Sequence, residues 1–99
     1  MRADAVEQLF VERRGGRVAI LVVLESPAGE RQRERMLAPT SDAAAAVRYA
    51  AVQLSRRGMR VGERLRVRRE RGGTLVDDPA LQRAFLDAME VPDEEEPWG

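Results

Sequence analysis

The chain contains no cysteine, histidine or lysine, and these absences exclude several kinds of site. Without cysteine there are no disulfides, thiolate nucleophiles or sulfur-bound metals. Without histidine and lysine, the commonest general bases and the imidazole-based metal sites are absent too. The serines have no base near them in the sequence, and no glycine-rich phosphate loop is present. The sequence therefore predicts a protein that is not an enzyme and that carries no metal and no cofactor.

All 17 basic residues are arginine, and asparagine is also absent. Residues encoded by A- and T-rich codons are scarce together, whereas alanine, arginine, valine and glycine are abundant. A GC-rich bacterial genome explains this usage better than selection for guanidinium chemistry at each position does. The choice of arginine over lysine is then uninformative, and only the clustering of the arginines carries information.

Long hydrophobic segments are missing as well. The longest apolar run, residues 18–24, is far shorter than the ~20 residues that span a bilayer. The N-terminal residues lead into charged residues without a hydrophobic core, so no secretory signal is expected. The sequence predicts a cytoplasmic protein that does not associate with membranes, with a single domain over residues 1–91.

Four segments have strand patterns. Residues 18–24 are β-branched and apolar on both faces, which predicts an interior strand. Side chains in residues 30–37 alternate weakly in polarity, which predicts a polar edge strand. Polar and apolar residues alternate strictly over residues 64–68, which predicts a half-buried strand. Residues 74–76 can pair back through a glycine turn. Residues 3–14 fit either a helix or a strand, and the short glycine-rich junction after them favours the strand.

Two helices are predicted in the second half of the chain. Ser41 can cap the first, which ends before Gly58, and Asp78 and Pro79 suit the start of the second. The expected fold class is α+β. It has an antiparallel sheet of four to five strands with two, or possibly three, helices packed on it, in the order β(or α)-β-β-α-β-β-α. No family is identified from these residues.

Arginine is concentrated in residues 56–71, where eight arginines are opposed by two glutamates. In a strand, alternating arginines project from one face about 6.5–7 Å apart, close to the phosphate spacing of a nucleic acid strand. The alternative is a solvated face neutralised by Glu30, Glu34, Glu63 and Glu70. The candidate residues for binding a polyanion or a partner are Arg56, Arg57, Arg60, Arg64, Arg66 and Arg68.

An acidic tail over residues 92–99 balances this cluster, and it is expected to be flexible. It allows three interpretations: a docking peptide anchored by its tryptophan, an intramolecular decoy for the arginines, or a solubilising tail. The candidate docking residues are Glu94, Glu95, Glu96 and Trp98.

The leading functional prediction is a small non-enzymatic protein-interaction module that forms a homodimer. The reason for the dimer is the strand at residues 18–24, because so few helices cannot cover both of its faces. The alternative is sequence-tolerant binding of a nucleic acid backbone. A sequence pI near 6.3 and the lack of aromatic residues between the arginines count against that alternative. The sequence leaves open the partner, the pathway and the oligomeric interface.

Overall fold

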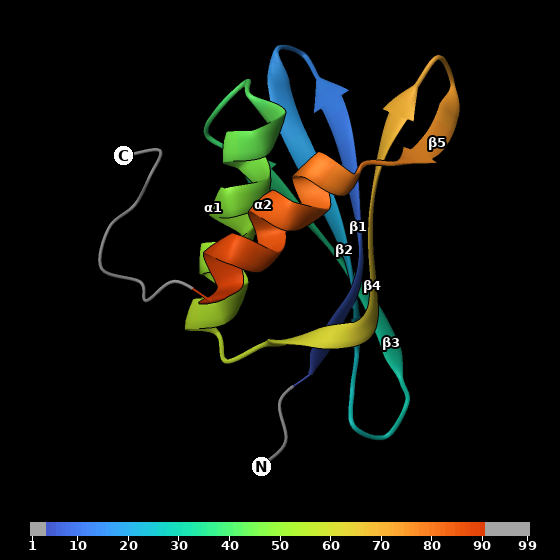
Figure 1. Cartoon of the computed structure of the whole chain (residues 1–99), viewed down its shortest axis with the longest axis vertical. Helices are drawn as coiled ribbons and strands as arrows, with labels where there is room; N and C mark the ends of the chain where they lie inside the picture. The colour runs from blue at the N-terminus through green and yellow to red at the C-terminus, as the bar shows by residue number, and fades with distance from the viewer. Residues whose placement is uncertain (1–3, 91–99) are drawn as a thin grey trace.

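A computed structural model describes residues 4–90 of the chain. The elements are β1 (Ala5–Arg14), β2 (Arg17–Glu25), β3 (Arg31–Ala38), α1 (Ala43–Arg56), β4 (Arg60–Arg71), β5 (Thr74–Asp77) and α2 (Pro79–Glu90) (Figure 1). The predicted α+β fold class and element order are confirmed, with a strand over the ambiguous N-terminal segment. Within the described residues, neither helix is long and apolar enough to cross a bilayer.

The five strands form one sheet in the order β3-β2-β1-β4-β5. Neighbouring strands pair antiparallel except β1 and β4, which run parallel. Helix α1 makes this parallel pairing possible, because it carries the chain from the β3 edge across the sheet to the far side of β1. The polar strand β3 lies at an edge, and the apolar strand β2 lies inside the sheet, as their patterns predict.

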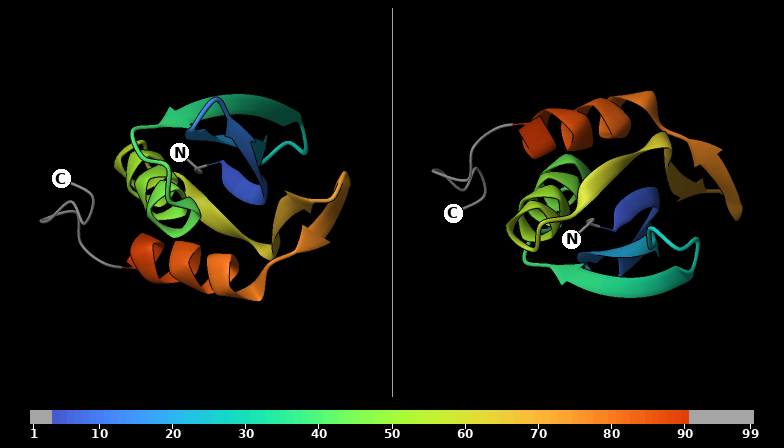
Figure 2. Two further views of the ribbon diagram at one scale, coloured as in Figure 1. Left: turned by 90° about the horizontal axis from the view of Figure 1, so that it is seen from above. Right: turned by 90° about the horizontal axis from the view of Figure 1, so that it is seen from below.

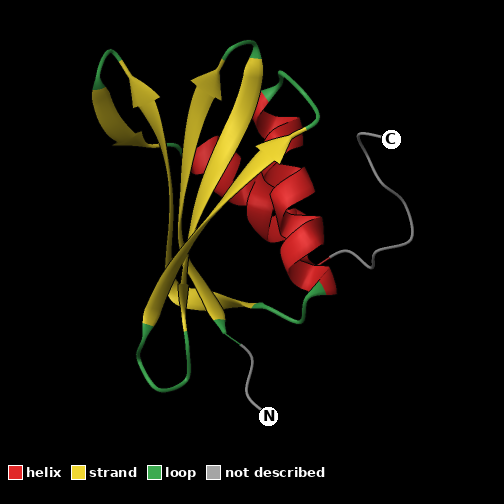
Figure 3. Ribbon diagram, turned by 180° about the vertical axis from the view of Figure 1, so that it is seen from behind, coloured by secondary structure: helices red, strands yellow, loops and turns green. Residues whose placement is uncertain are grey.

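Both helices pack on one face of the sheet (Figures 2 and 3). The core between them includes Leu9, Ile20, Leu54 and Phe85. Within the described residues, no helix covers the opposite face, which we call the open face (Figure 3). On that face of β2, Ala19 and Val23 are nevertheless only 2% and 7% exposed, because longer side chains on the neighbouring strands shield them. One chain therefore already covers much of the apolar surface that suggested a dimer.

The helix ends follow capping rules, with one correction to the sequence prediction. The N-cap of α1 is Asp42 rather than Ser41: Asp42 has extended backbone angles, and its Oδ2 accepts a hydrogen bond from the Ala45 amide at 2.8 Å. Asp78 caps α2 as predicted, accepting from the Leu81 amide at 3.0 Å. Gly58 follows α1 with a φ of +79°, the left-handed conformation that glycine adopts most readily.

The sheet is irregular at one place near its lower end. Val6 and Gln8 flank a bulge at Glu7, and their partners on β2 are the adjacent residues Leu24 and Val23. On β4, the partners of Val6 and Gln8 are Val61 and Arg66, which have four residues between them where β1 has only one. The three additional residues make β4 bend sharply (Figure 1). The bulge turns Val6 toward the helices and Gln8 toward the open face.

Candidate binding surface

The arginines clustered in the sequence do not form one surface. Arg57 lies beyond α1 and donates two hydrogen bonds to Glu34 on β3, at 2.7 and 3.0 Å. Arg56 is the exposed last residue of α1, and Arg60 lines a hollow at the lower end of the sheet. Arg69 is on the helical side, 3.4 Å from the cap residue Asp78. Half of the predicted binding residues, Arg56, Arg57 and Arg60, therefore do not belong to the row of arginines on the open face of β4, although Arg60 lines the same hollow as Arg64.

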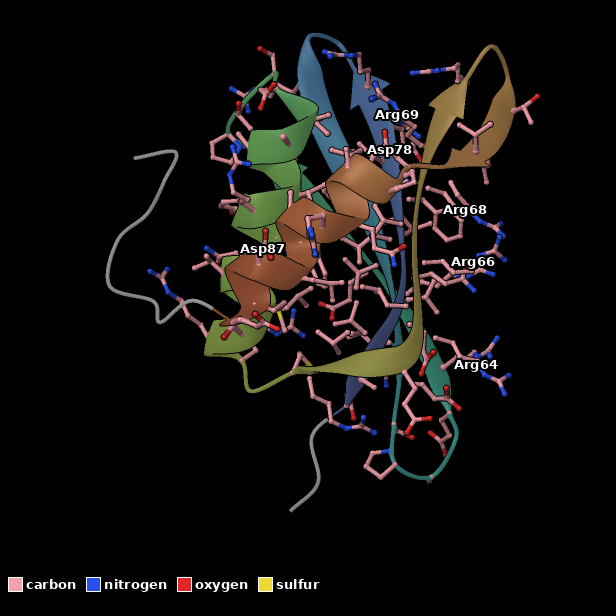
Figure 4. The ribbon with its side chains drawn as sticks, viewed as in Figure 1. Arg64, Arg66, Arg68, Arg69, Asp78 and Asp87 are labelled. Carbon is pink, nitrogen blue, oxygen red and sulfur yellow. The ribbon has the colours of Figure 1, made fainter. Side chains whose placement is uncertain are left out.

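The other half, Arg64, Arg66 and Arg68, projects from β4 on the side away from the helices (Figure 4). Arg66 and Arg68 each lie 3.2 Å from the Asp77 carboxylate on β5. The hydrogen bond from Arg66, reinforced by Arg68, lowers the pKa of Asp77 below its ordinary value. The carboxylate that neutralises Arg66 and Arg68 is therefore Asp77 on β5, which was not among the glutamates expected from the sequence.

The four glutamates expected to neutralise the cluster have other positions. Glu34 faces the helices and pairs with Arg57. Among residues 4–90, Glu30, Glu63 and Glu70 form no ion pair with any arginine. Among residues 4–90, Asp77 alone pairs with the arginines of β4 on the open face, so this face is neutralised in part.

A second row of arginines lies on β3. Arg33 and Arg35 pair with Val23 and Leu21 of β2 and thus point to the open face, where both are exposed. Within the described part of the chain, neither forms an ion pair, and the same is true of Arg64. The largest uncompensated positive charge on the open face therefore comes from β3.

Strand register brings the two rows of arginines to either side of an aromatic ring. Successive partners across the sheet are Arg35, Leu21, Phe10, Arg68 and Asp77. The next row contains Arg33, Val23, Gln8 and Arg66. With about 4.8 Å between strands, the arginines of β3 and β4 are about 14 Å apart. Phe10 was not among the residues expected from the sequence, because it pairs with Arg68 across strands and is distant from the arginines along the chain.

A hollow of about 230 Å³ opens beside Phe10. Leu21, Arg33, Leu75, Glu12 and Glu70 help to line it, so it combines an apolar wall, a cation and two carboxylates. The large hydrophobic residues left exposed among residues 4–90 are Leu37 and Leu75, and both belong to the open face. Apolar surface and unpaired charge thus occur together on this side of the sheet.

A larger hollow of about 520 Å³ lies at the bent end of β4. It contains the carboxyl groups of Glu7 and Glu25 together with three arginines, Arg31, Arg60 and Arg64. Burial raises the pKa of Glu7, and the hydrogen-bonded Glu25 carboxyl adds to this, while Arg31 and Arg60 oppose it. The hollow is thus a mixed-charge surface, and no group of three or more potential metal ligands occurs in the described residues.

The Glu7 environment predicts a pH-dependent effect of Glu7→Gln. A carboxyl whose pKa is raised in the folded state stabilises the fold at low pH, and that contribution is lost as the pH rises through the raised pKa. Glutamine stays neutral, so the variant is expected to melt above wild type at about pH 7 and near wild type at about pH 4. Thermal melts at both pH values test this, with Glu63→Gln, from the same hollow, as the control. A difference that is equal at both pH values contradicts the prediction.

The candidate docking residues Glu94, Glu95, Glu96 and Trp98 lie outside the described residues. Comparison with protein-family models, curated proteins and solved structures finds no significant match to this chain. The chemistry of the open face is therefore the basis for proposing a function.

Proposed function

We propose that this chain is a non-enzymatic interaction module and that it binds an anionic partner on its open face. The strongest support is that Arg33 and Arg35 are exposed and form no ion pair among residues 4–90. They lie beside the apolar side chains of Leu21 and Phe10 on the open face. Guanidinium groups bind phosphates and carboxylates through paired hydrogen bonds. An anionic partner would supply the negative charge that compensates Arg33 and Arg35 on β3.

The neutral total charge of the chain is compatible with such a partner. Four of its 17 acidic residues fall at positions 93–96, and the remaining 13 face 17 arginines, a surplus of four positive charges. Binding depends on the local distribution of charge, which steers the partner, more than on the total.

The predicted homodimer stays a prediction, and the open face gives little support to it. If a two-fold axis perpendicular to the strands brings two such faces together, the arginines of β3 lie opposite those of β3 in the other copy, and like charges repel. Light scattering decides the oligomeric state, since one chain has a mass of 11.1 kDa and a dimer twice that.

The proposal is tested by reversing the charge on β3. Arg33→Glu with Arg35→Glu is expected to weaken binding of the full chain to dextran sulfate at least about ten-fold at low salt, because two phosphate-like contacts are lost. The matched control is Arg48→Glu with Arg83→Glu, which makes the same charge change on α1 and α2. Equal losses in the two double variants, measured by fluorescence anisotropy, would show that binding reflects total charge and would remove the open face from the proposal.

A further inference from the structure

The open face carries features that narrow the class of anionic partner, given the function proposed above. We infer that the partner is a single-stranded nucleic acid and that one of its bases enters the hollow beside Phe10. Three parts of the surface support this: the spacing of the arginines, the ring between them, and the carboxylate at the hollow.

The arginines match a nucleic acid backbone running along the strands. Arg33 and Arg35 are two residues apart on one face of β3, which places them about 6.5–7 Å apart, near the separation of successive phosphates in an extended strand. Arg64 offers a further unpaired cation across the sheet (Figure 4). Three such contacts give a logarithmic salt slope of about −2 on a single strand.

Phe10 distinguishes a single strand from a duplex. Phe10 pairs with Leu21 on one side and Arg68 on the other, so it lies on the open face between the arginines of β3 and those of β4. An aromatic ring beside a cationic track is what unpaired bases stack on, whereas the bases of a duplex already stack on one another. The hollow beside the ring also reaches Arg33, so a base on Phe10 keeps its phosphate within range of β3.

Glu70 adds a preference among bases. Glu12 and Glu70 both line the hollow. Glu12 is held by Arg14 at 3.1 Å, whereas Glu70 has no ion pair among residues 4–90 and can accept from a bound base. An ionised carboxylate only accepts hydrogen bonds. The exocyclic amino group of cytosine can donate to it, and thymine carries no such group. Bases with an amino group should therefore occupy the hollow more readily than thymine.

An acidic peptide fits this surface less well. Its carboxylates could reach Arg33 and Arg35, but side chains entering the hollow would meet Glu70. Carboxylates in contact disfavour one another. A nucleic acid avoids this conflict, because its charge lies on the backbone and its neutral bases enter the hollow.

The experiment uses the full chain and fluorescently labelled oligo(dC) and oligo(dT) of about 12 nucleotides, a length within the range that small single-strand sites occupy. A duplex of the same length and poly-glutamate are the competing ligands. By anisotropy at low salt and about pH 7, oligo(dC) is expected to bind at least about five-fold tighter than oligo(dT). Both single strands should bind tighter than the duplex.

Variants connect these affinities to the hollow. Phe10→Leu is expected to weaken oligo(dC) binding about ten-fold, and Phe10→Tyr, which keeps a ring, should retain it. Glu70→Gln should remove the preference for oligo(dC) while oligo(dT) binding stays. Circular dichroism confirms that each variant is folded.

The outcomes separate this inference from the proposed function. Equal binding of duplex and single strand, tighter binding of poly-glutamate, or a Phe10→Leu variant that binds like Phe10→Tyr each overturns the single-strand inference. If dextran sulfate binding still depends on Arg33 and Arg35 in that case, the proposed anionic partner stands. If the wild-type chain binds no polyanion at low salt, both the proposed function and the single-strand inference are overturned.

Discussion

Replacing Phe85 by alanine is expected to lower the free energy of unfolding by about 3–5 kcal/mol. Among residues 4–90, Phe85 is the largest side chain that is fully buried. It anchors α2 against the core that α1 and the sheet form. Removing the ring costs its transfer free energy and leaves a cavity that fixed strands cannot close. Because small domains have only about 5–15 kcal/mol in total, this variant approaches unfolding.

Urea denaturation measures this effect, with Leu86→Ala as the control on the same helix. Leu86 is partly exposed and packs at the periphery of the core, so its truncation should cost much less. A urea midpoint for Phe85→Ala that equals that of Leu86→Ala would contradict the burial of Phe85 between α2 and the core.

Gly62→Ala is expected to destabilise the fold by about 1–3 kcal/mol, through crowding rather than backbone strain. A Cβ at this position would lie 2.7 Å from Oε1 of Glu7 and 2.9 Å from the carbonyl oxygen of Val6. The Glu7 carboxyl can move aside, but the Val6 carbonyl belongs to the sheet backbone and cannot. Gly62 does not have a positive φ, so alanine is otherwise compatible with the backbone there.

A double-mutant cycle with Glu7→Ala apportions this cost. Truncating Glu7 removes the side-chain contacts and leaves the Val6 carbonyl, so Gly62→Ala should cost less in that background but not become neutral. The cycle is read from the free energy of unfolding in urea. Strict additivity of the two substitutions would mean that Glu7 does not contact this site.

Much of the fold could be predicted from local patterns. Alternation identified the edge strand and β4, and Asp78-Pro79 identified the start of α2. The ambiguity over the N-terminal segment has a physical cause. The bulge at Glu7 places Val6 and Leu9 on the same face, three residues apart, and this spacing resembles a helix. Because of this one irregular residue, the apolar spacing in β1 fits a helix as well as a strand.

The candidate surface was less predictable. Sequence proximity grouped Arg57 with Arg64 and Arg66, but the turn after α1 and the bend in β4 send them to different sides of the sheet. Phe10 joined the arginines only through pairing between distant strands, which depends on register and has no local signal. The alternation of Gln8, Phe10 and Glu12 in a strand next to β4 was the nearest clue, and it required knowing the strand order.

The parallel pairing of β1 with β4 also determines the order in which the sheet can assemble during protein synthesis. During synthesis β1, β2 and β3 emerge first and can form a three-stranded meander. One edge of β1 has no partner until residues 60–71 have been made. An unpaired strand edge promotes association between chains, and pairing over such a sequence distance is slow. Aggregation during expression should therefore be most sensitive to substitutions in α1 and β4 that delay closure of that edge.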